Sequence, residues 1–245
     1  MRCVGTLHTP YGATEGLPLT SVTSKTLIET WPQTLRGGGV CVGPILDEMR
    51  VEIVRISDEP MAEWSDDLRV PPGAVGEIVA AGPTVSAAYV GLDQANARAK
   101  IRDGATVLHR MGDLGRIDET GRLWFCGRKS DRIETANRMI LPVSIEAILA
   151  EHAAVFQAAL VRMDSDPRQP VVACLRLEAG RVLDRPLVSE LDALLGGSDW
   201  AGSIDLYLQC KKIPTDTRHN SKIRRSDLPR QIRRRLGGGL APVAR

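Results

Sequence analysis

The sequence lacks any close pair of cysteines. Its five cysteines are odd in number, widely separated and nowhere spaced as Cys-x-x-Cys. This pattern argues against a structural zinc site and against the disulfide framework of a small secreted protein. The sequence also lacks an apolar run approaching the ~20 residues of a membrane span, and a basic segment followed by an apolar one near residue 1. These absences favour a reduced, cytoplasmic location and predict no transmembrane segment.

Aromatic residues are scarce at 4%, whereas the apolar content of 43% is ordinary for a chain of 245 residues. Such a chain can bury one large core or two modest ones. The formal net charge of +2 hides an uneven distribution, since residues 218–245 carry nine basic side chains against the single acid Asp227. We interpret residues 226–245 as a basic tail, with Arg233–Arg235 in a solvated helix end or a loose terminus. An anionic surface is a second interpretation of the tail, and no nucleic-acid partner is expected.

Short β-like segments punctuated by glycine and proline dominate the first half of the chain. They predict a small barrel-like sheet. Residues 92–100 are alanine-rich and charged, which predicts one short helix packed on that sheet. The β-like segments are residues 49–56, 76–80, 106–109 and 123–126.

The pattern changes after Arg128, where helices begin to alternate with strands. Pro142 can open a helix at its first turn, and an apolar stripe at helical spacing follows it. Strands at residues 155–163 and 171–177 and a helix at residues 186–195 complete the pattern. Helices alternating with strands after a strand-rich segment predict an α+β fold with a boundary near residues 129–132. The predicted domains are residues 1–129, residues 130–225 and the tail at residues 226–245.

Four short motifs follow one another along the chain. They are Pro10–Glu15 (PYGATE), His109–Asp113 (HRMGD), Trp124–Arg128 (WFCGR) and Asp216–Lys222 (DTRHNSK). Together they resemble the back half of the adenylate-forming superfamily of acyl-CoA synthetases, peptide-synthetase adenylation domains and luciferases. Within it they look most like the β-lactone synthetases of bacterial long-chain olefin biosynthesis. The likeness spans residues 9–225 and implies a partial AMP-binding core with a barrel-like subdomain, followed by a hinged α+β lid domain.

One part of the superfamily pattern is absent. The superfamily grips the ATP phosphates with a Ser/Thr/Gly-rich loop well upstream of the Tyr-Gly-x-Thr-Glu segment. Only ten residues precede Tyr11, and no stretch matches that loop or a G-x-x-x-x-G-K-[ST] cradle. We therefore expect a C-terminal piece of a larger enzyme, either a truncated reading frame or one half of a split protein, with Met1 an internal methionine. A separate N-terminal half is then an expected partner, and the chain alone is expected to be inactive.

Activating a carboxylate with ATP brings two anions together, so the catalyst needs cations, Mg²⁺ and aligned donors around the α-phosphate. A lysine on a mobile segment suits this role, because its flexible stem delivers a compact positive charge. The resemblance makes Lys222 that catalytic lysine, and it assigns Asp113 to the ribose hydroxyls and Arg128 to the ribose or phosphate. Taken singly, these residues would be a surface lysine, a turn aspartate and a salt-bridged surface arginine.

The Tyr-Gly-x-Thr-Glu segment completes the nucleotide site that the resemblance implies. Tyr11, Gly12 and Thr14 are assigned to the nucleotide, with Tyr11 against the adenine face and Thr14 donating to the α-phosphate. Glu15 would hold Mg²⁺ through one carboxylate oxygen, which is normal for a hard cation that also binds phosphate oxygens. The implied cofactors are ATP and Mg²⁺, and the implied substrate is a fatty-acid-type carboxylate. Alone, the segment would be an ordinary turn.

Three departures from the superfamily pattern bear on the second half-reaction. Coenzyme A ligases usually carry a glycine-rich loop along the pantetheine path, whereas residues 134–142 contain no glycine. Ser130 occupies the hinge position, where Asp or Lys is common, and Ser221 replaces the glycine before the catalytic lysine. A reaction without coenzyme A fits these departures: a β-hydroxy acid is adenylated, and its own hydroxyl then displaces AMP to close a β-lactone.

Two alternatives stay open. The chain could be a fragment of a fatty-acid–CoA ligase, since everything before the hinge fits equally well. It could instead be a non-catalytic binding or regulatory protein that kept the fold without the phosphate loop. Competition between coenzyme A and ring closure in a reconstituted enzyme would distinguish a ligase from a β-lactone synthetase. A phosphate loop encoded in the region upstream would favour a truncated or split enzyme over a non-catalytic protein.

Overall fold

The computed structural model describes residues 5–163, 166, 168–216, 222–237 and 243–244. The chain divides into two compact units, the first formed by Met1–Gln33 and Gly38–Ser130 and the second by Thr34–Gly37 and Asp131–Arg245. Both contain helices and β-sheets, so the predicted α+β class is confirmed. Within the described part of the chain, no helix combines the length and apolar character needed to cross a membrane.

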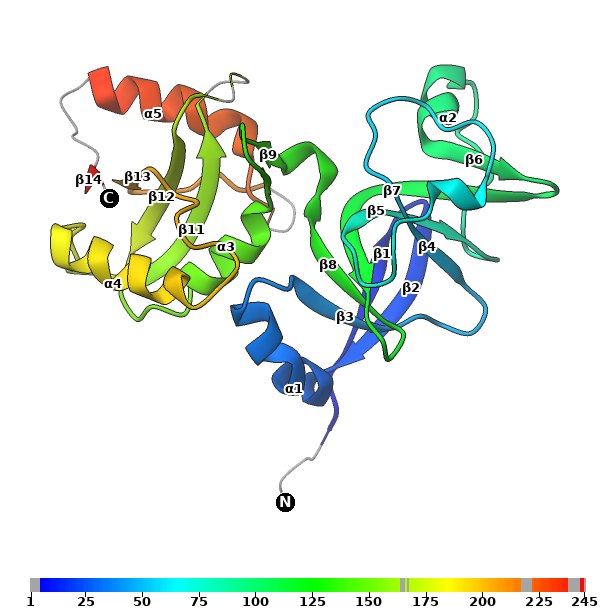
Figure 1. Ribbon diagram of the computed structural model, residues 1–245, viewed down its shortest axis with the longest axis horizontal. Helices are drawn as coiled ribbons and strands as arrows, with labels where there is room; N and C mark the ends of the chain where they lie inside the picture. Colours follow the sequence, from blue (N-terminus) through cyan, green and yellow to red (C-terminus); the bar gives the residue numbers. More distant parts are fainter. Residues whose placement is uncertain (1–4, 164–165, 167, 217–221, 238–242, 245) are drawn as a thin grey trace. The chain divides into compact units, whose positions relative to one another are not determined.

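The first unit opens with a β-hairpin and a helix (Figure 1). Strand β1 (His8–Ala13) pairs antiparallel with β2 (Gly16–Thr23), and helix α1 (Ser24–Leu35) follows directly. The Thr23 hydroxyl accepts a hydrogen bond from the Thr26 N–H at 3.1 Å, which satisfies one backbone donor of the first helical turn. Helix α1 was not predicted from the sequence, because Pro32 stands inside it. The threonine cap was the available signal.

A six-stranded antiparallel sheet forms the rest of the first unit. Its path is β3-β8-β7-β5-β4, and β6 pairs with β7. Every residue of β5 is buried: Ile78 and Ala80 join one apolar cluster, whereas Val79 and Ala81 join another on the opposite face. When both faces of a strand are buried, apolar and polar residues do not alternate along it, which explains the continuous apolar run Ile78–Ala81. The strands are β3 (Val40–Pro44), β4 (Arg50–Val54), β5 (Gly76–Ala81), β6 (Lys100–Asp103), β7 (Thr106–Ile117) and β8 (Arg122–Arg128).

The sheet curls in Figure 1, as the predicted barrel-like subdomain requires. Helix α2 (Asp93–Ala99) is the short helix predicted for residues 92–100, and it contacts β6 and β7. A short 3-10 turn, η1 (Asp66–Leu68), places Leu68 in the core of the same unit. The predicted architecture of the first half is therefore confirmed.

Strand β7 carries a break in register at Gly112. Val79 of β5 pairs with Arg110 and Glu77 pairs with Leu114, so β7 advances four residues where β5 advances two. Gly112 has a φ of 66°, a backbone conformation that L-residues rarely adopt. Extra residues of this kind bend a strand and re-aim the side chains next to them. Asp113 is the next residue, so the irregularity sets its direction.

The second unit contains a smaller, four-stranded sheet with the order β11-β12-β13-β14. Strands β12 and β13 are parallel, and the other neighbours are antiparallel. The predicted helix at Pro142, the two strands and the helix over residues 186–195 are all present, within two residues at their ends. The elements are η2 (Lys129–Asp131), β9 (Ile133–Glu134), β10 (Met139–Ile140), α3 (Pro142–Leu149), β11 (Val155–Arg162), β12 (Val171–Leu177), α4 (Arg185–Gly196), β13 (Leu206–Gln209) and β14 (Val243–Ala244).

Helical structure covers the first part of the segment predicted as a basic tail at residues 226–245. A 3-10 turn, η3 (Arg225–Asp227), leads into helix α5 (Leu228–Gly237). Leu228 and Ile232 are four residues apart on this helix and lie in the core cluster that includes Val172 and Leu208. Two apolar residues on one face of a helix can pack against a core even when the rest of the helix is rich in arginine. The sequence interpretation rested on the excess of arginine and did not consider these two residues.

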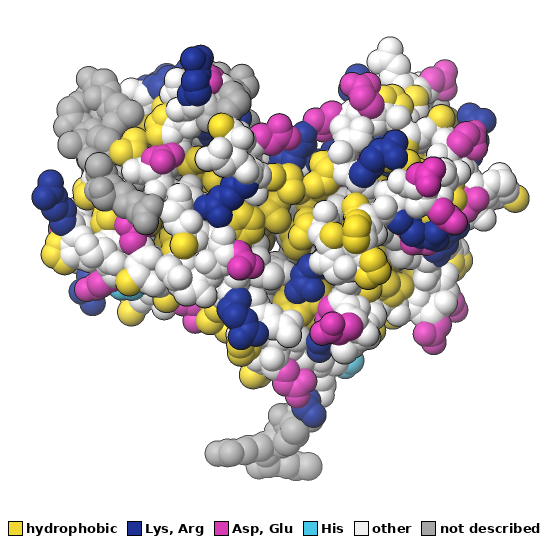
Figure 2. Space-filling view, in the orientation of Figure 1, with side chains coloured by type: hydrophobic (Ala, Val, Ile, Leu, Met, Phe, Trp, Pro, Cys, Tyr) yellow, Lys and Arg dark blue, Asp and Glu magenta, His cyan; other side chains and the backbone are white. Residues whose placement is uncertain are grey.

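Charged side chains of both signs are mixed on the face drawn in Figure 2. Lysine and arginine are interspersed there with aspartate and glutamate. A nucleic-acid surface is expected to gather positive charge into a patch or stripe. The absence of a nucleic-acid partner stays a prediction, since the view covers one face alone.

Docking of α5 predicts a stability difference between two leucines of the second unit. Leu228→Ala removes a side chain that is 0% exposed, and the cavity should lower the free energy of unfolding by about 2–5 kcal/mol. Leu194→Ala on α4 is the matched control, because Leu194 is 38% exposed and should cost less than about 1 kcal/mol. Hydrogen exchange at the amides of β12 measures both changes. Equal costs would mean that α5 is not part of this core.

Candidate functional site

The carboxylate of Asp113 is the centre of the candidate site, and its side chain is only 4% exposed. Arg128 is the residue directly opposite Asp113 across the β7–β8 pair, and its Nη1 lies 2.9 Å from Asp113 Oδ1. The Tyr11 hydroxyl, from β1, donates a hydrogen bond to Asp113 Oδ2 at 2.7 Å. Residues of three strands therefore meet at one carboxylate, with an ion pair at one oxygen and a hydrogen bond at the other.

The surroundings of Tyr11 keep its hydroxyl protonated. Burial, followed by the negative charge of Asp113, raises the pKa of Tyr11 well above 10. Its ring is tilted by 46° against the ring of Phe125, with centroids 5.9 Å apart. The Arg128 side chain is 41% exposed, although its Nη1 lies on the Asp113 carboxylate. An aromatic ring, a carboxylate and an accessible guanidinium together suit a ligand that carries hydroxyls, negative charge and a planar ring.

Thr14 and Glu15 form the two-residue turn between β1 and β2. Thr14 is exposed, and Glu15 is partly buried. The hydroxyl of Tyr89 donates to Glu15 Oε1 at 2.8 Å, and the Ser86 N–H donates to the Glu15 carbonyl oxygen at 2.7 Å. The turn is thus fixed by a loop about 70 residues away along the chain. Sequence analysis missed Tyr89, because no local pattern marks it.

Two basic side chains lie behind Glu15. Lys100 donates to the Ser86 carbonyl and hydroxyl oxygens, and its Nζ lies 5.3 Å from the centre of the Tyr89 ring. Burial lowers the pKa of Lys100, and burial lowers the pKa of His109 to about 4. Burial and the neighbouring Glu15 raise the pKa of Tyr89 to about 12. At neutral pH, His109 is therefore uncharged and Tyr89 keeps the proton that it donates to Glu15.

Glu15 fits the metal role that sequence analysis assigned to it. The hydrogen bond from Tyr89 lowers the pKa of Glu15, so the carboxylate is ionised at neutral pH. Among the described residues, no group of three or more His, Cys, Asp or Glu side chains could hold a metal ion by itself. A single carboxylate that shares its cation with phosphate oxygens is a normal arrangement for Mg²⁺. The donor set therefore suits Mg²⁺ brought in with a nucleotide.

Lys222 and Ser130, the predicted hinge residue, are the remaining predicted site residues. Lys222 belongs to the second unit, where its side chain is exposed. Its carbonyl oxygen accepts a hydrogen bond from the Asp216 N–H at 2.9 Å, while residues 217–221 lie outside the described part of the chain. Ser130 lies in η2 and is the last residue of the first unit. The structure thus brings Tyr11, Asp113 and Arg128 together, with the Gly12–Glu15 segment continuing from Tyr11.

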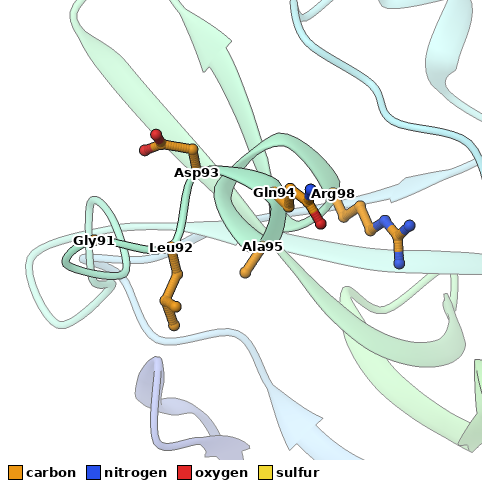
Figure 3. Close-up of a pocket in the computed structure, with 6 residues that line it drawn as sticks. All are labelled: Gly91, Leu92, Asp93, Gln94, Ala95 and Arg98. Carbon is orange, nitrogen blue, oxygen red and sulfur yellow. The ribbon is translucent and has the colours of Figure 1, made fainter.

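An open hollow near α2 is a separate feature (Figure 3). Its lining contains none of the predicted site residues. Figure 3 shows the Leu92 and Arg98 side chains pointing in different directions from this segment. The lining does not bring several polar groups together, so the hollow does not define the site. It is lined by Gly91, Leu92, Asp93, Gln94, Ala95 and Arg98.

Known proteins similar to this chain fall into one superfamily. The chain is 40% identical over 225 residues to the olefin beta-lactone synthetase of Stenotrophomonas maltophilia, which covers 90% of this chain and 41% of that protein. It is 30% identical over 219 residues to the 2-succinylbenzoate–CoA ligase of Bacillus cereus, with 71% and 45% covered. The chain thus spans less than half the length of these curated relatives. No family model matches it.

A solved structure shares the fold. The O-succinylbenzoate coenzyme A synthetase of Bacillus subtilis, in complex with AMP, superposes with a TM-score of 0.69 at 21% identity. The match covers 91% of this chain and 40% of that one. At this identity the likeness concerns the fold alone.

Burial of His109 predicts a pH dependence of stability. The pKa of His109 is lowered from 6.5 to about 4, so folding favours its neutral form. The stability it contributes is complete above pH 6.5 and is lost as pH falls toward about 4. His109→Gln should weaken this loss, whereas exposed His8→Gln should leave it unchanged. Urea unfolding at pH 7.5 and 5.0 measures how much unfolding free energy each protein loses between the two pH values. Equal losses in the wild type and both variants would contradict this role of His109.

Proposed function

We propose, because this chain belongs to the superfamily of adenylate-forming enzymes, that it supplies the nucleotide-binding strands and the lysine-bearing lid of an enzyme that activates a carboxylic acid with ATP. The observation that carries the proposal is the Asp113 carboxylate held between Tyr11 and Arg128. These residues come from three motifs in the order that the superfamily requires. Because the chain covers 41% of the length of the olefin beta-lactone synthetase that it matches, the activity is proposed for the assembled enzyme.

The first half-reaction follows from the placement of these side chains. A carboxylate oxygen of the substrate attacks the α-phosphorus of ATP, the new acyl–O–P bond forms, and the bond to pyrophosphate breaks. Asp113 accepts from the ribose hydroxyls, Arg128 adds guanidinium donors, and the Tyr11 ring lies against the adenine. Thr14 donates to the α-phosphate. Bound to Glu15 and the phosphates, Mg²⁺ would offset their negative charge.

Lys222 delivers the positive charge that the two reacting anions need. Its side chain is exposed, as a residue that must reach a substrate requires, and its carbonyl oxygen accepts a hydrogen bond from the Asp216 N–H. Ser130 is the proposed hinge, because it is the last residue of the first unit and Asp131 opens the second. Rotation there would bring Lys222 to the carboxylate for one half-reaction and withdraw it for the next.

The second half-reaction is proposed to close a β-lactone. The β-hydroxyl oxygen of the adenylated acid attacks the acyl carbon, the C–O bond of the ring forms, AMP leaves, and the hydroxyl proton is released. The supporting feature is the glycine-free β9–β10 hairpin, in which Arg138 donates to the Asp199 and Ala201 carbonyl oxygens at 3.0 Å each. A hairpin fixed by such bonds differs from the glycine-rich loop of coenzyme A ligases. A curated relative that is 40% identical to this chain is named for this lactone product.

A coenzyme A ligase is the second candidate, favoured by the 30% identity to a 2-succinylbenzoate–CoA ligase. Both candidates share adenylation and differ only in the group that displaces AMP. Adding coenzyme A to the assembled enzyme, with a β-hydroxy acid and ATP, separates them: lactone supports the first candidate and acyl-CoA supports the second.

Removal of the Lys222 charge tests adenylation itself. The chain combined with an N-terminal half from a full-length relative should release pyrophosphate from ATP and a long-chain β-hydroxy acid. Lys222→Ala should lower this rate by about 10²-fold or more, as expected for loss of one transition-state donor. Lys211→Ala, at an exposed lysine, is the matched control and should keep the rate. Pyrophosphate release that survives in Lys222→Ala would contradict the role of Lys222.

A further inference from the structure

Arg225 lies three residues after Lys222 and is the hub of an ion network in the second unit. Its side chain is only 12% exposed. The guanidinium contacts two carboxylates, Glu146 on α3 and Asp131 beside the unit boundary. Neither adenylation nor ring closure, as derived above, gives this arginine a role.

Arg225 and Glu146 form a bidentate ion pair. Arg225 Nη2 donates to Glu146 Oε2 at 2.8 Å, and Nη1 donates to Glu146 Oε1. Nη1 also donates to the Leu160 carbonyl oxygen at 3.2 Å, and Glu146 Oε1 accepts from the Leu160 N–H at 2.6 Å. The arginine is therefore fixed to α3 and β11 at once. Only the planar fork of a guanidinium can satisfy these directions together.

The third donor reaches the start of the second unit. Arg225 Nε donates to Asp131 Oδ2 at 3.0 Å. Asp131 directly follows the proposed hinge residue Ser130 and is the first residue of the unit's main segment. The same side chain thus links the segment after Lys222 to the point where the unit begins.

The backbone around Lys222 is closed by strand-like pairing. The Asp216 N–H donates to the Lys222 carbonyl at 2.9 Å, and the Arg224 N–H donates to the Pro214 carbonyl at 2.9 Å. Thr215 and Ile223 form the antiparallel bridge between these bonds. Three residues span at most about 11 Å, so the fixed guanidinium of Arg225 limits where Lys222 can lie.

We propose that Arg225 is a positioning residue that fixes the Lys222 backbone to Asp131, so that the lysine and the start of the lid move as one body. Without this link, movement at Ser130 would be taken up partly by the Lys222 loop, and the ammonium group would reach the substrate less often. The inference rests on the proposed function for the identity of Lys222, whereas the anchoring of the loop stands on the contacts alone.

Hydrogen exchange on the 245-residue chain tests the anchoring directly. Arg225→Met should speed exchange of the Asp216 and Arg224 amides by about 10-fold or more, while the β12 amides change by less than about 3-fold. Arg224→Met is the matched control, because Arg224 is exposed and is a neighbouring arginine of the same segment. It should leave the Asp216 amide and the β12 amides unchanged. Unchanged exchange at Asp216 and Arg224 in Arg225→Met would overturn the proposal.

A second variant covers the outcome in which Arg225→Met unfolds the unit. Arg225→Lys keeps the charge opposite Glu146 but lacks the fork that also reaches Asp131 and Leu160. It should preserve β12 protection and still loosen the Asp216 and Arg224 amides. Loss of β12 protection in both variants would mean that Arg225 maintains the fold of the unit and has no specific effect on the loop.

Kinetics of the assembled enzyme test the consequence for Lys222. Arg225→Lys should lower kcat for adenylation about 10-fold with little change in the KM for ATP, and it should add nothing to Lys222→Ala, because both act through one group. Full additivity, or a change confined to KM, would overturn the positioning role. If exchange behaves as expected while the wild-type enzyme releases no pyrophosphate, the anchoring holds and the proposed function fails.

Discussion

The buried carboxylate of Asp113 is the constraint on which the candidate site depends. A carboxylate taken out of water must be met by charge and hydrogen bonds, and Arg128 and Tyr11 supply both. Meeting that need fixes β1 and β8 relative to β7. The break in register at Gly112 sets the direction of Asp113, and the position of β1 carries the Thr14–Glu15 turn with it. One requirement of electrostatics thus arranges the strands that would bind the nucleotide.

The two residues beside Ser130 are each held by buried charges of their own unit. On one side, Lys129 donates to Glu77 at 3.2 Å, and Glu77 also accepts from the buried Arg110 at 2.6 Å. On the other side, Asp131 accepts from Arg225. Both residues that flank Ser130 are therefore held by contacts within their own unit. These contacts support the proposed hinge at Ser130, which stands where Asp or Lys is common.

Sequence alone predicted the fold class, the curled sheet and most elements of the second unit, because these rest on local periodicity and on glycine and proline positions. It also named Tyr11, Asp113 and Arg128, which the structure brings together. It could not find Tyr89 or Arg225, since their importance comes from partners that pairing brings near. The packing of helix α5 was not predicted, because the segment was interpreted from its many arginines and not from its two buried residues, Leu228 and Ile232.

We propose that the Asp113 carboxylate receives the ribose of an adenylate. A crystal structure of the assembled enzyme with a non-hydrolysable acyl-adenylate analogue would test this role. We expect both ribose hydroxyls within hydrogen-bonding distance of Asp113, the adenine against the Tyr11 ring, and the Arg128 guanidinium on the ribose or phosphate side. An analogue bound elsewhere, with Asp113 still enclosed by Tyr11 and Arg128 alone, would contradict it.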